Sequence, residues 1–161
     1  MTRLVLEPIG IIHSPYVEPE GTPIQPAAAE GVLGSVDVFP VYVPGLQDLE
    51  GFSHIILVYR FHLAGPPALQ VTPFLDDHVH GVFATRAPAR PNAIGLSVVR
   101  LLGIDCGSLA ICDMDVLDGT PLLDIKPYVP EFDTRAGAAI GWLQGRTGRL
   151  SSARDDDRFG R

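Results

Sequence analysis

Cysteine is scarce in this chain of 161 residues, and long apolar runs are missing. Cys106 and Cys112 are the only two cysteines, too few for a disulfide framework or a cysteine-rich zinc site, so both are interpreted as reduced thiols. No stretch reaches the roughly 18 uncharged apolar residues of a membrane span, and the N-terminal residues lack the apolar region of a signal peptide. These absences exclude a membrane-spanning or disulfide-rich protein and predict a cytoplasmic one.

Positive charge is also in short supply, because 12 basic residues stand against 19 acidic ones and give a formal net charge of -7. This balance excludes electrostatic binding of nucleic acid by the protein surface as a whole, since phosphate binding needs clustered lysine and arginine. Residues 1–133 hold 6 basic and 16 acidic side chains (-10), whereas residues 134–161 hold 6 and 3 (+3). Any polyanion must therefore be held by a local patch, together with the arginine-rich C-terminal residues.

Apolar runs of strand length recur between glycines and prolines, and several are dense in valine, isoleucine and leucine. This pattern is typical of strands rather than helices. We expect strands at residues 4–13, 32–39, 54–62, 71–74, 82–85, 95–104, 109–116 and 122–125. Short strands at this spacing, joined by glycine-containing turns, predict a mainly β protein: a small closed or nearly closed β-barrel with one or two short helices.

The length of the chain predicts one compact domain with a core of its own. We assign residues 1–134 to the barrel and residues 135–161 to a short helix and a basic C-terminal tail. Short helices are expected at residues 44–50 and 137–144. The polar stretch after Gly145 carries adjacent charges and is expected to be frayed or disordered.

Several common catalytic motifs are missing from the sequence. No G-x-G-x-x-G follows an expected strand and no P-loop is present, which disfavours a Rossmann dinucleotide site and a nucleoside triphosphatase. None of the serines that closely follow a glycine completes G-x-S-x-G, so a hydrolase nucleophile has little support. The chemistry of this chain must rest on other residues.

Two groups of possible ligands in the sequence do not meet the requirements of a metal site. His78 and His80 would share one face of a strand, but no distant cysteine or histidine cluster completes the shell, so no metal is expected. Asp113, Asp115 and Asp118 resemble part of a calcium loop, yet their spacing does not match an EF-hand. We interpret these three as exposed acids on a strand face.

The most informative stretches are residues 81–97, GVFATRAPARPNAIGLS, and residues 118–128, DGTPLLDIKPY. A strand is expected to deliver Arg86 into a proline-rich connection that carries Arg90 and Asn92. The stiffness of this connection lowers the entropy cost of holding these side chains in place. Arg86 suits a carboxylate and Arg90 suits a phosphate, although surface arginines in a loop fit the pattern equally well.

Motifs along about four fifths of the chain resemble the tRNA methyltransferase O family, also described as TsaA-like or YaeB-like. These motifs run from IGIIHSPY (9–16) through Gln25-Pro26, LEGFSH (49–54) and Phe61-His62 to Pro127-Tyr128. The resemblance implies a β-barrel domain, a homodimer, and S-adenosylmethionine held in a groove near the dimer interface.

The resemblance also places the cofactor and substrate contacts by position. The implied cofactor-binding residues are Ile24, Gln25, Pro26, Phe61, His62, Arg86, Leu96, Asp118, Gly119, Thr120 and Pro121. Phe61 and Leu96 would provide apolar walls, and Arg86 would meet the carboxylate of the cofactor. The expected substrate-binding residues are Arg90, Asn92, Lys126 and Tyr128, of which Tyr128 could stack on a base.

The implied reaction is methyl transfer to N6 of a threonylcarbamoyl-adenosine next to the anticodon of tRNA, without a metal. A sulfonium is already a good leaving group, so the protein mainly aligns the reactants and excludes water. The acceptor nitrogen must lose a proton, and Asp118 and His62 are the expected catalytic acceptors, with no choice between them from the sequence. Two alternatives stay open: a methyltransferase acting on a small molecule or another RNA, and a non-catalytic S-adenosylmethionine-binding module.

Overall fold

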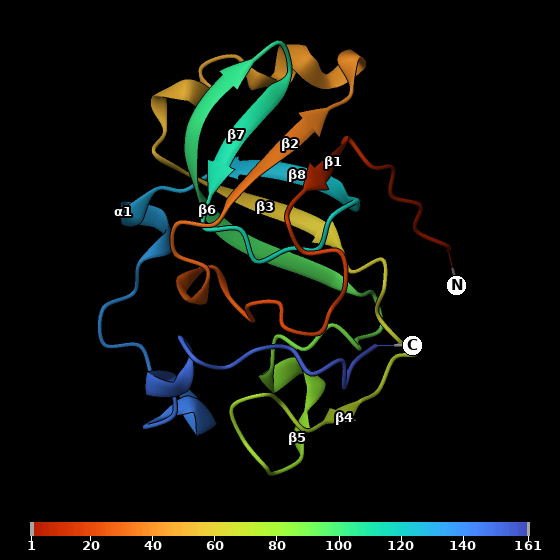
Figure 1. Cartoon of the computed structure of the whole chain (residues 1–161), viewed down its shortest axis with the longest axis vertical. Helices are drawn as coiled ribbons and strands as arrows, with labels where there is room; N and C mark the ends of the chain where they lie inside the picture. The colour runs from red at the N-terminus through yellow and green to blue at the C-terminus, as the bar shows by residue number, and fades with distance from the viewer. Residues whose placement is uncertain (1, 161) are drawn as a thin grey trace.

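The computed structural model describes residues 2–160, and its centre is a closed antiparallel barrel (Figure 1). The strands of the barrel are β1 (Gly10–His13), β2 (Leu33–Val38), β3 (His54–Arg60), β6 (Ile94–Asp105), β7 (Ser108–Cys112) and β8 (Thr120–Pro127). They follow the order β1-β2-β7-β6-β3-β8 around the barrel. The mainly β fold expected from the sequence, a small closed barrel, is confirmed.

Alternation along the strands builds the core of the barrel, because successive side chains point to opposite faces. In β3, Ile55 and Leu57 are fully buried and Tyr59 is almost fully buried. This strand pairs with β6 on one side and with β8 on the other. Its register on β8 shifts between Val58 and Tyr59. Tyr59 is thus the last core residue of β3 before the chain leaves the barrel.

Gly95 in β6 lies opposite Tyr59 and leaves room for two aromatic rings. A Cβ atom at Gly95 would overlap the Tyr59 ring and would come within 2.7 Å of the Phe61 ring. The two rings pack edge to face with their centroids 5.4 Å apart. The missing side chain at Gly95 therefore positions Phe61, which follows β3.

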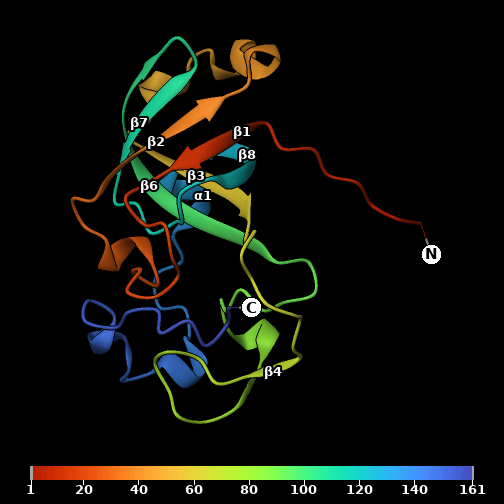
Figure 2. The same cartoon turned by 45° about the vertical axis from the view of Figure 1, so that its right-hand side comes forward.

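A second, smaller layer lies against one end of the barrel (Figures 1 and 2). It contains the two-stranded sheet of β4 (Gln70–Val71) and β5 (His80–Gly81), the 3-10 helix η4 (Val82–Ala84), and residues 135–160, here called the C-terminal segment. Its own small core consists of Val71, Val82, Ala87, Ala89 and Phe159. The exposed N-terminal residues 2–8 extend away from the barrel in Figure 2.

Four of the expected strands differ from the structure. The strand expected at residues 109–116 ends at Cys112, where β7 ends. The strand expected at residues 4–13 begins only at Gly10, because β1 is the part that pairs with β2 and β8. The strand expected at 71–74 is reduced to β4. The strand expected at 82–85 is wrong: this stretch forms η4, in which Val82 is buried and Phe83 is 75% exposed.

The expected helices are short 3-10 turns instead of α-helices. Residues 44–50 fall in η2 (Pro40–Leu46) and η3 (Leu49–Gly51), where Pro44 cannot donate a helical hydrogen bond. Residues 137–144 contain only η5 (Gly141–Leu143). The remaining turns are η1 (Pro26–Ala28) and η6 (Thr147–Arg149), and α1 (Pro130–Asp133) is the one α-helix in the described part of the chain. None of the helices between residues 2 and 160 has the length and apolar character needed to span a membrane.

The expectation of a frayed tail after Gly145 is wrong for the residues that the structure describes. The Asp155 amide donates to the Thr22 carbonyl oxygen (2.9 Å), and the Gly21 amide donates to the Asp155 carbonyl oxygen (2.7 Å). Phe159 is only 8% exposed and packs edge to face on Phe74. Backbone pairing and one buried aromatic side chain hold this polar stretch on the second layer.

Candidate active site

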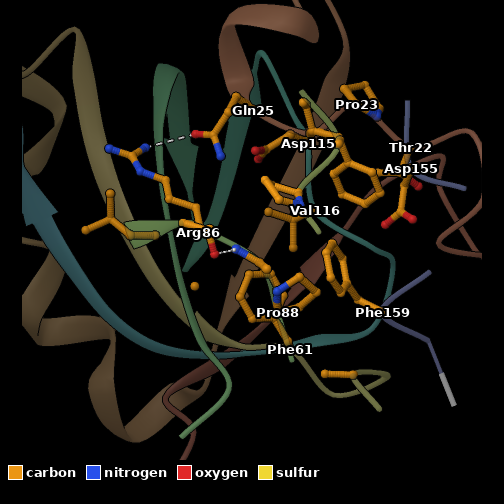
Figure 3. Close-up of a pocket in the computed structure, with 18 of the residues that line it drawn as sticks. Thr22, Pro23, Gln25, Phe61, Arg86, Pro88, Asp115, Val116, Asp155 and Phe159 are labelled. Atoms are coloured by element: carbon orange, nitrogen blue, oxygen red, sulfur yellow. Dashed lines mark hydrogen bonds between the residues drawn. The ribbon is translucent and has the colours of Figure 1, made fainter. Parts of the chain in front are cut away.

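A pocket of about 970 Å³ lies at the junction of the barrel and the second layer. Its volume is at the upper end of the roughly 300–1,000 Å³ that is usual for small-molecule sites. Its walls come from the loop around η1, the end of β3, the loop after η4, the β7–β8 connection and the C-terminal segment. Figure 3 shows side chains from these distant parts of the sequence around one cavity.

Arg86 lies at the exposed rim of the pocket. Its Nη1 atom donates a 2.9 Å hydrogen bond to Oε1 of Gln25, marked by a dashed line in Figure 3. This contact joins two residues that are 61 positions apart and that were both expected to bind the cofactor. A guanidinium has five N–H donors, so Arg86 keeps further donors for a carboxylate.

Arg90 shapes the loop that carries Arg86. Its Nη1 atom donates to the carbonyl oxygens of Thr85 (3.1 Å) and Ala87 (3.0 Å). These bonds fold the chain back on itself between residues 85 and 90. Arg90 also lines the pocket, so it stabilises the loop as well as adding positive charge to the wall.

The apolar walls lie where the sequence analysis expected them. Ile24, Pro26, Phe61 and Leu96 all line the pocket. Leu96 is 47% exposed although it belongs to a barrel strand, because its side chain faces this opening and not the core. The walls can therefore bury the flat, apolar faces of a ligand.

His62 lines the pocket and is oriented by a hydrogen bond with Thr120. The Thr120 hydroxyl donates to the Leu117 carbonyl oxygen (2.7 Å) and lies 3.2 Å from Nδ1 of His62. Because the hydroxyl hydrogen is already engaged, Nδ1 of the imidazole is the donor and Nε2 keeps its lone pair. Burial, and then the nearby Arg60, lower the pKa of His62, which favours a neutral ring at pH 7.

His62 lines the pocket, whereas Asp118 is not among the described residues that form its wall. One oxygen, Oδ1, accepts a hydrogen bond from the Ser14 amide and lies 3.2 Å from Nδ1 of His13. Gly119, in the turn before β8, and Pro121, within β8, are likewise outside the pocket wall. The structure thus brings one of the two expected proton acceptors into the cavity and places the other beside β1.

Three expected substrate-binding residues lie outside the pocket: Asn92, Lys126 and Tyr128. Lys126 forms an ion pair with Asp124 (2.7 Å), and the Tyr128 hydroxyl lies 3.2 Å from Oγ1 of Thr134. Strand β8 has its Thr120 end at the pocket, so Lys126 lies roughly 20 Å further along the strand. Lys126 and Tyr128 can therefore meet only a substrate large enough to extend along β8.

A hydrogen-bonded polar chain at the pocket wall was not predicted from the sequence, and the interpretation of Asp115 as an exposed acid is wrong. Ser97 donates a 2.7 Å hydrogen bond to Oδ1 of Asp115, which lines the pocket. The Tyr59 hydroxyl lies 2.9 Å from Oγ of Ser97. Burial raises the pKa of Asp115 to about 7. The residue spacing offered no signal that separates Asp115 from Asp113, which pairs with Arg100 outside the pocket (2.7 Å).

The C-terminal segment adds residues that the sequence analysis also missed. Asp155, Phe159 and Trp142 line the pocket. Burial raises the pKa of Asp155 to about 6. These contributions could not be found while the segment was expected to be frayed.

The histidines considered for a metal are engaged with Asp76 instead. His78 Nδ1 lies 3.0 Å from Asp76 Oδ1, and His80 Nε2 lies 2.9 Å from Asp76 Oδ2. These contacts, led by His78, hold the pKa of Asp76 well below its usual range, and Arg146 lies 3.6 Å from the same carboxylate. Between residues 2 and 160 we find no cluster of three metal-ligating side chains.

The sequence of this chain is similar to those of S-adenosyl-L-methionine-binding proteins and tRNA methyltransferases. A probable S-adenosyl-L-methionine-binding protein of Pyrococcus abyssi is 59% identical over 152 residues, which cover 94% of this chain and 83% of that protein. The tRNA (adenine(37)-N6)-methyltransferase of Homo sapiens is 36% identical over 139 residues, covering 82% of this chain and 32% of the human protein.

A solved structure shows the same fold. The crystal structure of TrmO from Pseudomonas aeruginosa superimposes with a TM-score of 0.75 at 42% identity, over 89% of this chain and 62% of that one. The chain therefore spans less than two thirds of the length of that protein. The sequence profile of the tRNA-methyltransferase O N-terminal domain matches residues 11–134. On these findings, the chain belongs to the tRNA-methyltransferase O N-terminal domain family.

Proposed function

We propose that this protein is an S-adenosylmethionine-dependent methyltransferase that modifies N6 of the adenosine next to the anticodon of tRNA, in its threonylcarbamoylated form. Membership of the family supports the methyltransferase, and the names of the human and mouse relatives support the tRNA position. The observation that carries the proposal is the pocket of about 970 Å³ in which Arg86, His62, Asp115 and apolar walls meet.

The residues of the pocket fit the chemical groups of S-adenosylmethionine. Arg86 suits its carboxylate, and the half-buried acid Asp155 suits its positive charges. Phe61 and Leu96 suit the faces of its adenine. When bound, the cofactor supplies a methyl group on a positively charged sulfur, which keeps the bonding electron pair as the methyl group leaves.

The protein itself orients the acceptor and excludes water. The pocket, about 970 Å³ in volume, lies at the upper end of the usual range for small-molecule sites, and we assign it both the cofactor and a nucleobase splayed out of an anticodon loop. The apolar walls remove competing water from the acceptor nitrogen. His62, Asp115 and Asp155 are proton acceptors that line this cavity.

Recognition of the tRNA backbone requires positive charge near the opening. Arg86 is exposed at the rim, and Lys126 is 62% exposed along β8. The C-terminal arginines contribute less than their number suggests, because Arg146 lies beside Asp76 and Arg158 is paired with Asp156. We therefore assign the main phosphate contacts to Arg86 at the pocket rim and to Lys126 further along β8, where Lys126 is also paired with Asp124.

The assembly and location of the protein belong to the same proposal. We propose a cytoplasmic homodimer in which residues 1–134 form the catalytic barrel. The exposed apolar side chains of Leu4, Val5 and Leu6, with exposed fractions of 80%, 70% and 53%, support an additional contact surface. Light scattering of the purified chain measures the assembly directly, and a monomer at micromolar concentration would contradict this part.

Mass spectrometry of tRNA nucleosides tests the reaction. Cells without the gene should lose the methyl group from threonylcarbamoyl-adenosine, and the purified protein with S-adenosylmethionine should restore it to their tRNA. Binding of S-adenosylmethionine in calorimetry without methylation of tRNA or total RNA would favour a small-molecule methyltransferase or a non-catalytic binding module. The names of several relatives, which mention only S-adenosyl-L-methionine binding, make this control necessary.

A further inference from the structure

Three residues from different strands and connections form a hydrogen-bonded chain that ends in the pocket. Tyr59 on β3 contacts Ser97 on β6 (2.9 Å), and Ser97 contacts Asp115 in the β7–β8 connection (2.7 Å). Tyr59 and Ser97 are 4% and 1% exposed. The Asp115 side chain is drawn at the pocket wall in Figure 3.

The hydroxyl donors determine which way the hydrogen bonds run from Tyr59 to Asp115. The Ser97 hydroxyl hydrogen is directed to Asp115, so Ser97 can only accept from Tyr59. Burial raises the pKa of Tyr59 above its usual range, so the phenol stays protonated and donates. Tyr59 therefore donates to Ser97, and Ser97 donates to Oδ1 of Asp115. These two hydrogen bonds hold the Oδ1 atom in place.

The second oxygen of Asp115 remains accessible from the pocket. Among residues 2–160, Oδ2 has no hydrogen bond to another residue, and Asp115 has no ion-pair partner within 4.0 Å. No fully buried side-chain oxygen or nitrogen in this part of the chain lacks a partner, so Oδ2 is not sealed inside the protein. Such an atom is free to bind a ligand or to take a proton.

We propose that Oδ2 of Asp115 accepts the proton of the acceptor nitrogen during methyl transfer, and that Ser97 and Tyr59 position it. The inference rests on the proposed function, because it concerns the acceptor of that reaction. The nitrogen forms the new N–C bond while the C–S bond breaks and its electron pair stays on sulfur. The N–H electron pair remains on nitrogen, and the proton passes to Oδ2 and then to solvent.

The charges around Asp115 support this assignment over His62. The titratable groups that share the pocket are Tyr59, His62, Arg86, Arg90 and Asp155. Burial dominates and raises the pKa of Asp115 to about 7, while Arg86 lowers it by a smaller amount. The pKa of His62 is shifted in the opposite direction, so His62 holds a proton less strongly than an ordinary histidine. A base with a pKa near the working pH is the more effective one.

Asp115→Asn is the decisive variant, because asparagine keeps an oxygen that can accept from Ser97. Calorimetry with S-adenosylmethionine should give a Kd within about threefold of wild type, whereas the single-turnover rate on tRNA should fall by about 10²- to 10⁴-fold. Asp113→Asn makes the same chemical change two residues away, outside the pocket. Its rate should equal that of wild type once its folding has been checked by thermal melting.

Ser97→Ala provides a second test that does not depend on loss of the carboxyl group. The hydrogen bond from Ser97 lowers the pKa of Asp115, so its removal should raise that pKa. A ¹³C NMR titration of the aspartate carboxyl groups in the ligand-free protein should show this rise, and the acidic limb of the pH–rate profile should move to higher pH by the same amount.

Each outcome decides between distinct conclusions. A matching loss of cofactor affinity and rate in Asp115→Asn would make Asp115 a cofactor ligand and overturn the proposal. A single-turnover rate of Asp115→Asn within tenfold of wild type would also overturn it. So would a pH–rate profile of Ser97→Ala that coincides with that of wild type. If the wild-type protein binds S-adenosylmethionine but methylates no tRNA, the proposed function itself fails and the assignment of Asp115 falls with it.

Discussion

The indole nitrogen of Trp142 donates a 2.7 Å hydrogen bond to the carbonyl oxygen of Ala84. The same indole stacks on the His80 ring, with centroids 4.5 Å apart and an interplanar angle of 24°. Trp142 thereby fastens the C-terminal segment to η4 and β5, which lie beside the pocket. The walls of the site depend on contacts between residues that are far apart in the sequence.

Phe159→Ala should loosen the C-terminal segment without unfolding the barrel. Phe159 is buried in the small core of the second layer, and truncation of a buried phenylalanine costs about 3 kcal/mol at its site. Hydrogen exchange of the amides of Gly21 and Gly65, which bond to carbonyl oxygens of this segment, should become faster. The control is Phe132→Ala, because Phe132 is 70% exposed. Unchanged exchange in Phe159→Ala would contradict the proposed anchoring.

The pH dependence of stability should report the partly buried carboxyl of Asp115. Its folded pKa, about 7, lies above the unfolded value of about 3.9, so its contribution to stability is complete below about pH 4 and is lost as the pH rises through 7. Asp115→Asn should therefore be more stable than wild type at pH 8, on the order of 2 kcal/mol, and should lose this advantage at pH 4.5. Urea unfolding at both pH values measures the difference. Equal stability at pH 8 would indicate an ordinary, solvated carboxyl.

Arg86→Ala should weaken S-adenosylmethionine binding by about 1.5 to 3 kcal/mol, because a charge-assisted contact with the cofactor carboxylate is lost. Calorimetry in the presence of a chelator gives this value and also tests the expectation that no metal is needed. Arg135→Ala is a suitable control, since Arg135 bonds only nearby carbonyl oxygens in an exposed part of the C-terminal segment. If both variants bind like wild type, Arg86 acts on the substrate or has only a surface role.

Gly95→Ala should destabilise the protein and displace the aromatic wall. The added Cβ would overlap the Tyr59 ring and crowd Phe61, a change that costs on the order of 2 kcal/mol when a core is overpacked. Gly103→Ala lies in the same strand with no atom within 4 Å of the new Cβ, so it should have little effect. Thermal melting of both variants provides the comparison. A wild-type melting temperature for Gly95→Ala would show that the rings move without cost.

Lys126→Ala should lower tRNA affinity and reduce the salt dependence of binding. One lost phosphate contact decreases the slope of log K against log salt by about 0.7 to 0.9. Asp124 competes for Lys126 in the free protein, so Asp124→Asn should have the opposite effect on affinity. Salt titrations of tRNA binding by both variants test this pair. If the slopes match that of wild type, the phosphate contacts lie elsewhere.

The barrel was predictable because its signal is local. Ile55 and Leu57 alternate with less buried neighbours along β3, and a pattern of period two requires no knowledge of distant residues. Residues 82–85 misled the same reasoning, since a short apolar stretch fits a strand and a turn equally well. The apolar pocket wall, including Phe61 and Leu96, followed from the family resemblance.

The polar part of the site could not be predicted in the same way. Asp113 and Asp115 look alike in the sequence, and only their partners, Arg100 and Ser97, separate a surface ion pair from a pocket acid. Those partners come from β6 and are brought to the acids by strand pairing. The role of Phe159 was hidden for a related reason, because one apolar residue among charged neighbours gives no periodic signal.

The bridge between Pro23 and Arg154 joins the loop before η1 to the C-terminal segment. This pairing can form only after the C-terminal segment has been synthesised. A chain emerging from the ribosome N-terminus first can close the barrel once Pro127 is exposed. The pocket stays incomplete until residues 155–160 have followed, because their side chains form part of its wall. A nascent chain that emerges N-terminus first can therefore have a closed barrel before it has a complete binding site.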